Sequence, residues 1–206
     1  MQEAVRVGAW SGKALPYLRR VAYLESHGTE YIDTGVVPEI GCEIECEYFY
    51  TEYATVSNAK ALFSAGTGTY QLIALGSFDD VHGFYFKYFA HGSAKHLTYY
   101  PTTGEWYRIF VDSVGVATVG GSSIVSSAEY ELDGIDTTLY LLARRNKTSF
   151  MKGRIRSFSL SSKTGNKLLD LIPVLDLSGR PAMYDEVSGQ FFYNQGTGEF
   201  TWGELN

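Results

Sequence analysis

Paired carboxylates are the first candidates for chemistry in this sequence. A glycoside hydrolase needs two of them facing one another across a groove, one as the acid and the other as the nucleophile or base. The nearest pattern is Glu131-Leu-Asp133-Gly134-Ile-Asp136, where Gly134 favours a turn, so we interpret it as a solvated loop. Asp79-Asp80 and Asp185-Glu186 are adjacent pairs, which diverge on a strand and are typical of turns. No Gly-x-Ser-x-Gly elbow surrounds a serine. The sequence therefore predicts no catalytic residue, although a triad assembled through space stays open.

Aromatic and histidine side chains gather in one part of the sequence, from Phe78 to Tyr100. Sugar recognition needs flat aromatic faces for the C–H side of a pyranose and planar polar groups for its hydroxyls. The set that could form such a carbohydrate-binding site at one end of the fold is Phe78, Asp79, His82, Tyr85, His91 and Tyr99. The alternative is that the aromatic residues belong to the core and the histidines are solvated.

No motif for a resident cofactor or a zinc ion is present, and the sequence predicts none. Cys42 and Cys46 lie about 13 Å apart along an extended strand, beyond disulfide reach, so we predict that both are small core residues. A structural calcium ion stays open, because Asp79, Asp80, Asp133 and Asp136 fall in loops, but they form no dense ligand loop.

Short strands joined by glycine turns must position these side chains. Aromatic residues make up 15% of the chain and glycine occurs 22 times, while helical periodicity is hard to find, so the pattern predicts an all-β fold. The stretch from Tyr23 to Gly35 predicts a hairpin-like pair of strands around Gly28. Between residues 84 and 89 both strand faces are aromatic, which indicates a central strand or one near a site.

Three further expectations concern the second half of the chain. Trp106 is expected to cap the core, with Tyr107, Ile109 and Val111 sharing one strand face. The alternation of a regular strand would not place Ile155, Phe158 and Leu160 on one face, because one position is odd and two are even. The pattern predicts a bulge or burial on both faces. Two C-terminal hairpins are expected to turn at residues 187–189 and 195–198.

Four stretches carry a resemblance to a known family: Tyr23-Leu-Glu-Ser-His-Gly-Thr-Glu-Tyr-Ile-Asp-Thr-Gly35, Gly153-Arg-Ile-Arg-Ser-Phe-Ser-Leu160, Leu169-Asp-Leu-Ile-Pro-Val174 and Met183 to Gly198. In these stretches the chain resembles the concanavalin A-like lectin/glucanase superfamily, in the laminin-G-like form found in gut-bacterial surface proteins and their phages. The resemblance implies a concanavalin A-like jelly-roll β-sandwich of two antiparallel sheets. The glucanase branch carries Glu-x-Asp-x-x-Glu on one strand, and this chain departs from it at Asp136, so the resemblance supports architecture before chemistry.

We expect the chain to consist of an N-terminal extended arm and one domain. The 206 residues suffice for a single sizeable sandwich, so we expect an arm at residues 1–22 and the sandwich at residues 23–206. The arm has scattered apolar residues that cannot form a core of their own. We predict that it docks to another subunit, and the candidate docking residues are Val5, Val7, Trp10, Leu15 and Tyr17. The alternative is that the arm completes an edge of the sandwich.

Charge and the N-terminal sequence limit the partners. A net charge of −6 argues against nucleic acid and anionic membranes, and no apolar stretch approaches the length of a transmembrane segment. Because the N-terminus lacks a signal-peptide pattern, we expect a phage virion component, such as a head decoration, fibre or tail protein. It would be a non-enzymatic module that binds cell-surface or host glycans and neighbouring subunits, and a homo-oligomer is open. The alternatives are a bacterial cell-surface or extracellular lectin-like protein and, third, a glycoside hydrolase.

Overall fold

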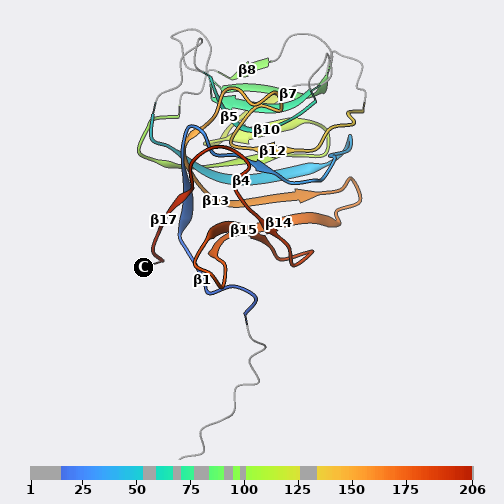
Figure 1. The fold of residues 1–206 in the computed structure, drawn as a ribbon. Coiled ribbons are helices and arrows are strands. Elements are labelled where there is room, and N and C mark those ends of the chain that lie inside the picture. Colours follow the sequence, from blue (N-terminus) through green and yellow to red (C-terminus); the bar gives the residue numbers. More distant parts are fainter. Residues whose placement is uncertain are drawn as a thin grey trace, which may run out of the picture.

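The computed structural model describes residues 15–52, 59–66, 71–76, 84–90, 95–97, 101–125 and 134–205. In these ranges the chain forms seventeen strands and no helix, and the strands pair antiparallel in two sheets (Figure 1). The all-β prediction is therefore confirmed. No helix of the described ranges has the length and apolar character needed to cross a bilayer.

Eleven strands make up the larger sheet. Eight of them follow the path β11-β10-β9-β4-β13-β14-β15-β16, while β2 pairs with β13, β17 pairs with β2, and β1 pairs with β14. Their bounds are β1 Arg19–Arg20, β2 Tyr23–His27, β4 Glu43–Tyr50, β9 Trp106–Val111, β10 Val116–Val119, β11 Ser122–Val125, β13 Lys152–Ser161, β14 Lys167–Leu175, β15 Pro181–Asp185, β16 Phe191–Phe192 and β17 Thr201–Gly203.

Six strands make up the smaller sheet, in the order β3-β12-β5-β6-β7-β8. Their bounds are β3 Ile32–Asp33, β5 Lys60–Ala65, β6 Gln71–Gly76, β7 Phe84–Ala90, β8 Lys95–Leu97 and β12 Tyr140–Leu141. The aromatic strand β7 lies between β6 and β8, so it is not an edge strand. Phe84, Phe86 and Tyr88 all point into the core, and a positive φ of 49° at Phe89 lets that side chain join them.

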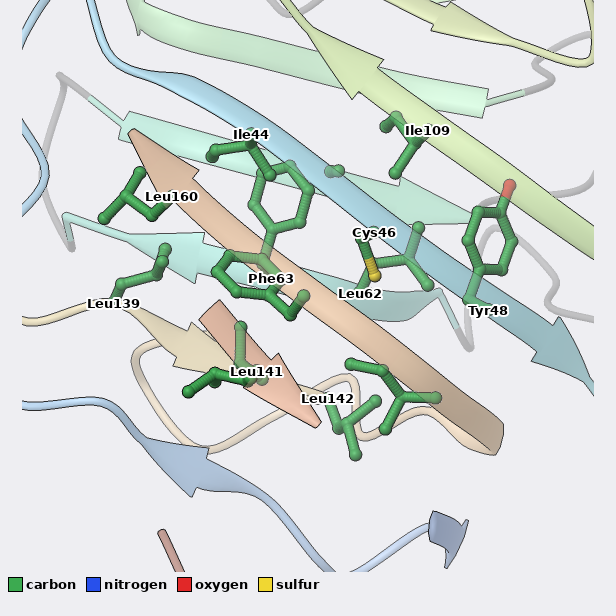
Figure 2. Packing of buried hydrophobic residues seen from close by; sticks show 14 of the residues in the cluster. Ile44, Cys46, Tyr48, Leu62, Phe63, Ile109, Leu139, Leu141, Leu142 and Leu160 are labelled. Carbon is green, nitrogen blue, oxygen red and sulfur yellow. The ribbon is translucent and has the colours of Figure 1, made fainter. Parts of the chain in front are cut away.

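The core fills the space between the two sheets. In β4, the alternate residues Ile44, Cys46, Tyr48 and Tyr50 are buried, because side chains of a strand point to opposite faces in turn. Phe63 from the smaller sheet meets Phe158 from the larger one with ring centroids 6.1 Å apart. Figure 2 shows Phe63 among Ile44, Leu160 and Leu141, which come from both layers. The contacts define a β-sandwich.

The two cysteines lie in this core as free thiols, as predicted. Burial raises the pKa of the Cys42 thiol to about 12, and burial also raises the pKa of Cys46. Both sulfurs therefore stay protonated and act as small apolar groups.

A bulge in β13 explains why the inward-facing residues change from odd to even positions after Ile155. The register of β13 against β4 shifts between Ile155 and Ser157, so that Ile155 and Phe158 both reach the core although they are an odd number of positions apart. The predicted bulge is confirmed. Its consequence is that Arg154 and Arg156 both lie near the aromatic rings of the outer face.

The predicted hairpin at the start of the domain is wrong in its pairing. Residues 23–27 and 32–33 are strands, but β2 belongs to the larger sheet and β3 pairs with β12 in the smaller one. Both edges of β2 are occupied, by β13 and β17, so no edge is left for β3. The stretch therefore connects the two layers of the sandwich.

A buried carboxylate, Glu30, organises this connection. Its Oε2 accepts hydrogen bonds from the backbone N–H of His27 at 2.7 Å and of Thr29 at 3.2 Å, and from Ser26 Oγ at 3.1 Å. Ser26 Oγ in turn lies 2.8 Å from the carbonyl oxygen of Met151. The turn, with Gly28 at a φ of 101°, is therefore fixed by one side chain that is 2% exposed.

The C-terminal turns are confirmed in one case and corrected in the other. Residues 187–189 turn between β15 and β16, which pair as a hairpin. Residues 195–198 do not lead back to β16, because β17 pairs with β2 instead. Asn194 and Gln195 bind the backbone of Tyr31, at 3.1 Å and 2.9 Å, which directs the chain toward the first strands of the domain.

Candidate functional site

The outer face of the larger sheet carries ordered rows of polar and aromatic side chains. Because alternate residues of β4 are buried, Glu43, Glu45, Glu47 and Phe49 point away from the core. The pairing registers place Phe110 opposite Glu45, Glu45 opposite Ser159, and Ser159 opposite Asp170. This row crosses four neighbouring strands, β9, β4, β13 and β14, so the four side chains are cross-strand neighbours.

A shallow groove of about 210 Å³ lies along this row. The lining side chains on the outer face combine one aromatic ring, three hydroxyls, three carboxylates and one ammonium group. The lining side chains of this face are Glu43, Glu45, Phe110, Ser157, Ser159, Ser161, Lys167 and Asp170. We call these residues the β4–β13 groove.

Ion pairs hold three of the four charged side chains of the groove. Arg108 lies 2.7 Å from Glu45, between the Nη2 and Oε2 atoms, and Lys167 Nζ lies 2.5 Å from Asp170 Oδ2. The backbone N–H of Asp170 donates to the buried Asp185 carboxylate at 2.8 Å, which ties β14 to the end of β15. Phe110 is 39% exposed at the other side of the groove. The groove thus presents an apolar ring face and fixed hydrogen-bond acceptors to solvent.

These groups are suited to binding hydroxyl-rich molecules. Carboxylates accept hydrogen bonds from hydroxyls, serine can donate or accept, and an exposed ring can contact the C–H face of a sugar. Glu43 and Glu45 lie on one face of β4, roughly 7 Å apart along the strand, which is a spacing that hydrolysis also uses. A general acid, however, is typically held protonated by apolar surroundings, whereas Glu45 has a 37% exposed side chain paired with Arg108.

An aromatic and cationic seam borders the groove on the same face. The Trp106 ring lies 5.4 Å from the Phe49 ring and 6.0 Å from the Tyr23 ring. Arg154 covers Tyr23 at 4.4 Å and Phe49 at 4.7 Å, and Arg156 covers Trp106 at 4.5 Å. The expectation that Trp106 caps the core is therefore wrong, since parity sends it outward while Ile109 and Val111 point inward as predicted. In the seam, guanidinium groups therefore lie over the faces of all three rings.

The carbohydrate site expected from the sequence lies mostly outside the described residues. Phe78, Asp79, His82, His91 and Tyr99 all fall there, so their assignment stays a prediction. Tyr85 is on the outward side of β7, half-buried against Ala59 and Ala61, and burial raises the pKa of its hydroxyl while nearby Arg144 opposes the shift. Tyr85 belongs to the smaller sheet, on a different face from the β4–β13 groove.

The sequence contained a signal for the groove that the prediction did not use. In residues 43–47 every second residue is Glu, and in residues 157–161 every second residue is Ser. Each run predicts one polar strand face. What the pattern could not give is that β4 and β13 are neighbours, since 109 residues separate Glu47 from Arg156.

The expected docking residues divide between described and undescribed parts of the chain. Val5, Val7 and Trp10 lie outside the described residues. Leu15 is 61% exposed, whereas Tyr17 is 7% exposed and packs against Ile172, Val174 and Tyr184 of the chain's own sandwich. A docking role for the set stays a prediction, and in this structure Tyr17 serves the chain's own fold.

The calcium expectation is likewise open. Asp79, Asp80 and Asp133 lie outside the described residues, and Asp136 is exposed. Within the described ranges, no group of three or more His, Cys, Asp or Glu side chains is arranged to hold a metal ion.

Comparison with known proteins supports the fold. No family model matches the sequence, and no curated protein is similar to it in sequence. Among solved structures, the chain is similar to a candidate carbohydrate-binding protein from Bacteroides ovatus, with a TM-score of 0.61 and 12% sequence identity. The match covers 91% of this chain and 61% of the Bacteroides chain, so this chain spans about three fifths of that protein's length. At this identity the likeness is one of fold, and the fold shared is a β-sandwich.

Proposed function

We propose that this protein is a non-enzymatic, concanavalin A-like module that binds carbohydrate in the β4–β13 groove. The observation that carries the proposal is the row Phe110, Glu45, Ser159 and Asp170 along a groove of about 210 Å³. One exposed ring beside several fixed polar groups is the usual composition of a sugar site. The solved structure of similar fold, itself a candidate carbohydrate-binding protein, agrees with this proposal.

Glycan binding by a Phe110→Ala variant tests the site. A glycan array should identify bound oligosaccharides, and calorimetry should show an affinity loss of about fivefold, since a ring contact contributes about 1 kcal/mol. Val114→Ala is the matched control, because Val114 is 67% exposed in the β9–β10 turn, outside the groove. The melting temperature of both variants should stay near that of the wild type.

Two other results would redirect the proposal. If Tyr85→Ala abolished binding while Phe110→Ala bound normally, the site would lie on the smaller sheet, as the sequence predicted. If the bound oligosaccharide were cleaved, and Glu43→Gln or Glu45→Gln stopped the cleavage, the protein would be a glycoside hydrolase. We expect the oligosaccharide to be recovered intact after prolonged incubation.

We also infer that the module is displayed on a phage virion, with the N-terminal arm docked to a neighbouring subunit. This inference rests on the family resemblance and on the apolar residues of the arm, of which Leu15 is exposed. Co-assembly of a variant that lacks residues 1–15 with virion proteins tests it, and unchanged assembly would argue for the cell-surface alternative. Electron microscopy of the assembled particle would give the position of the protein directly.

A further inference from the structure

We infer that the β4–β13 groove selects uncharged glycans over glycans that carry carboxylate or sulfate groups. The inference rests on the proposed function, because it concerns the ligand of the same groove. It follows from the signs and the pairing of the charges that line the groove.

The lining has more negative than positive groups. Glu43, Glu45 and Asp170 supply three carboxylates, and Lys167 supplies one ammonium group. Lys167 is already paired with Asp170, and Arg108 at the margin is paired with Glu45. An anionic sugar would therefore have to displace a carboxylate from a cation or lie beside carboxylates of its own sign, and both are unfavourable.

The cations of the bordering seam are also paired with carboxylates, so they attract an anionic ligand only weakly. In the bordering seam, Arg154 lies 3.0 Å from Glu25, and Arg156 is paired with Glu47. The guanidinium groups that cover the seam rings thus each have a carboxylate partner. Across the groove and the seam, the cations named here are all neutralised by neighbours on the sheet.

Neutral sugars match the same lining. Ionised carboxylates are acceptors only, so their best partners are donors such as sugar hydroxyls. The serines can accept or donate, and Phe110 can contact the ring face of the sugar. A hydroxyl-rich ligand without charge satisfies the acceptors and leaves both ion pairs intact.

The test uses a matched pair of ligands. Each neutral oligosaccharide that binds is compared with its C6-oxidised form, in which a carboxylate replaces the hydroxymethyl group. At about 0.01 M salt the oxidised form should bind at least about tenfold more weakly. At about 1 M salt the difference should shrink, because the Debye length falls from about 30 Å to about 3 Å, while the affinity of the neutral form should change little.

Variants separate the groove from the net charge of the protein. Glu43→Gln keeps the shape of the side chain and should reduce the difference in affinity between the neutral and the oxidised oligosaccharide. Glu204→Gln removes the same charge from an exposed pair with Arg19 outside the groove and should leave the difference unchanged. Equal narrowing in both variants would attribute selectivity to net charge and overturn the inference.

The outcomes distinguish this inference from the proposed function. If the oxidised form bound as tightly as the neutral one at low salt, and Phe110→Ala weakened both, the groove would be a glycan site and the charge selection would be wrong. If neither neutral nor oxidised oligosaccharides bound, the proposed function would fail and the inference with it.

Discussion

At the scale of single residues, Glu30 shows how a buried charge can define a fold. Burial alone would raise the pKa of its carboxyl group. Hydrogen bonds from the backbone of His27 and Thr29 and from the Thr29 hydroxyl lower the pKa by more than burial raises it, so the net pKa is below the usual range. The ionised form is therefore the one that the folded protein prefers. Its stabilisation is present above the unfolded pKa of about 4.3 and is lost as the pH falls through the lower folded pKa.

We predict that Glu30→Gln lowers the free energy of unfolding at neutral pH by about 2–3 kcal/mol, because charge-assisted bonds to buried donors are weakened. The free energy of unfolding should also depend less steeply on pH below about pH 4.3, since the variant lacks one titrating group whose pKa is lowered by folding. Urea unfolding at several pH values measures both effects. Glu199→Gln, an exposed residue close to the same turn, is the control; equal stability of the two variants would contradict this account of Glu30.

At the scale of elements, the C-terminal turn is built against the first turn of the domain. A side chain on Gly196 would place its Cβ atom 1.9 Å from the carbonyl oxygen of Thr29, and one on Gly198 would lie 2.6 Å from Glu30 Oε1. Thr29 Oγ1 also donates to the carbonyl oxygen of Thr197 at 2.7 Å. The turn near Gly28 and the turn at residues 196–198 are therefore in direct contact.

Gly196→Ala should destabilise the protein by about 2–3 kcal/mol, because the contact is with backbone, which cannot move aside as a side chain would. Gly134→Ala is the matched control, since a Cβ atom there meets nothing within 4 Å and φ is not positive. Chemical denaturation of both variants measures the difference. A Gly196→Ala protein as stable as the wild type would mean that the two turns do not pack as described.

The element scale is also where sequence reasoning succeeds and stops. Alternation in β4 and the change of parity in β13 predict strands, buried faces and a bulge, because these depend on neighbours in sequence. The partner of each strand depends on distant residues. The sequence pattern therefore predicts that β2 and β3 pair with one another, whereas in the structure they belong to different sheets. The groove was missed for the same reason, since Glu45, Ser159 and Asp170 come together only through pairing.

At the scale of the whole molecule, residues that precede the expected start of the sandwich at residue 23 already contact it. Arg19 and Arg20 pair with Leu175 and Val174 in β14, and Val21 is 2% exposed in the main core. Residues 17–21 thus form part of the larger sheet and its packing. This segment therefore packs on the chain's own sandwich, with β1 and β15 on opposite sides of the end of β14.

Tyr17→Ala should therefore lower the free energy of unfolding by about 3 kcal/mol, because a buried aromatic side chain is removed. Leu18→Ala, in the same segment but 56% exposed, should change it by less than about 0.5 kcal/mol. Thermal or urea unfolding of the two variants measures the contrast. Equally small effects would show that the segment is not packed on the sandwich in solution and would restore a boundary near residue 23.

The pairing of β2 with β13 and β17 has a consequence for biosynthesis. A ribosome releases β2 early, yet its partner residues lie at positions 152–155 in β13 and 201–203 in β17, and the Thr29–Thr197 bond spans 168 positions. Such distant pairing makes folding slow. β2 therefore stays without these partners until residues 152–203 have been synthesised, and in that interval its unpaired edges expose the nascent chain to aggregation.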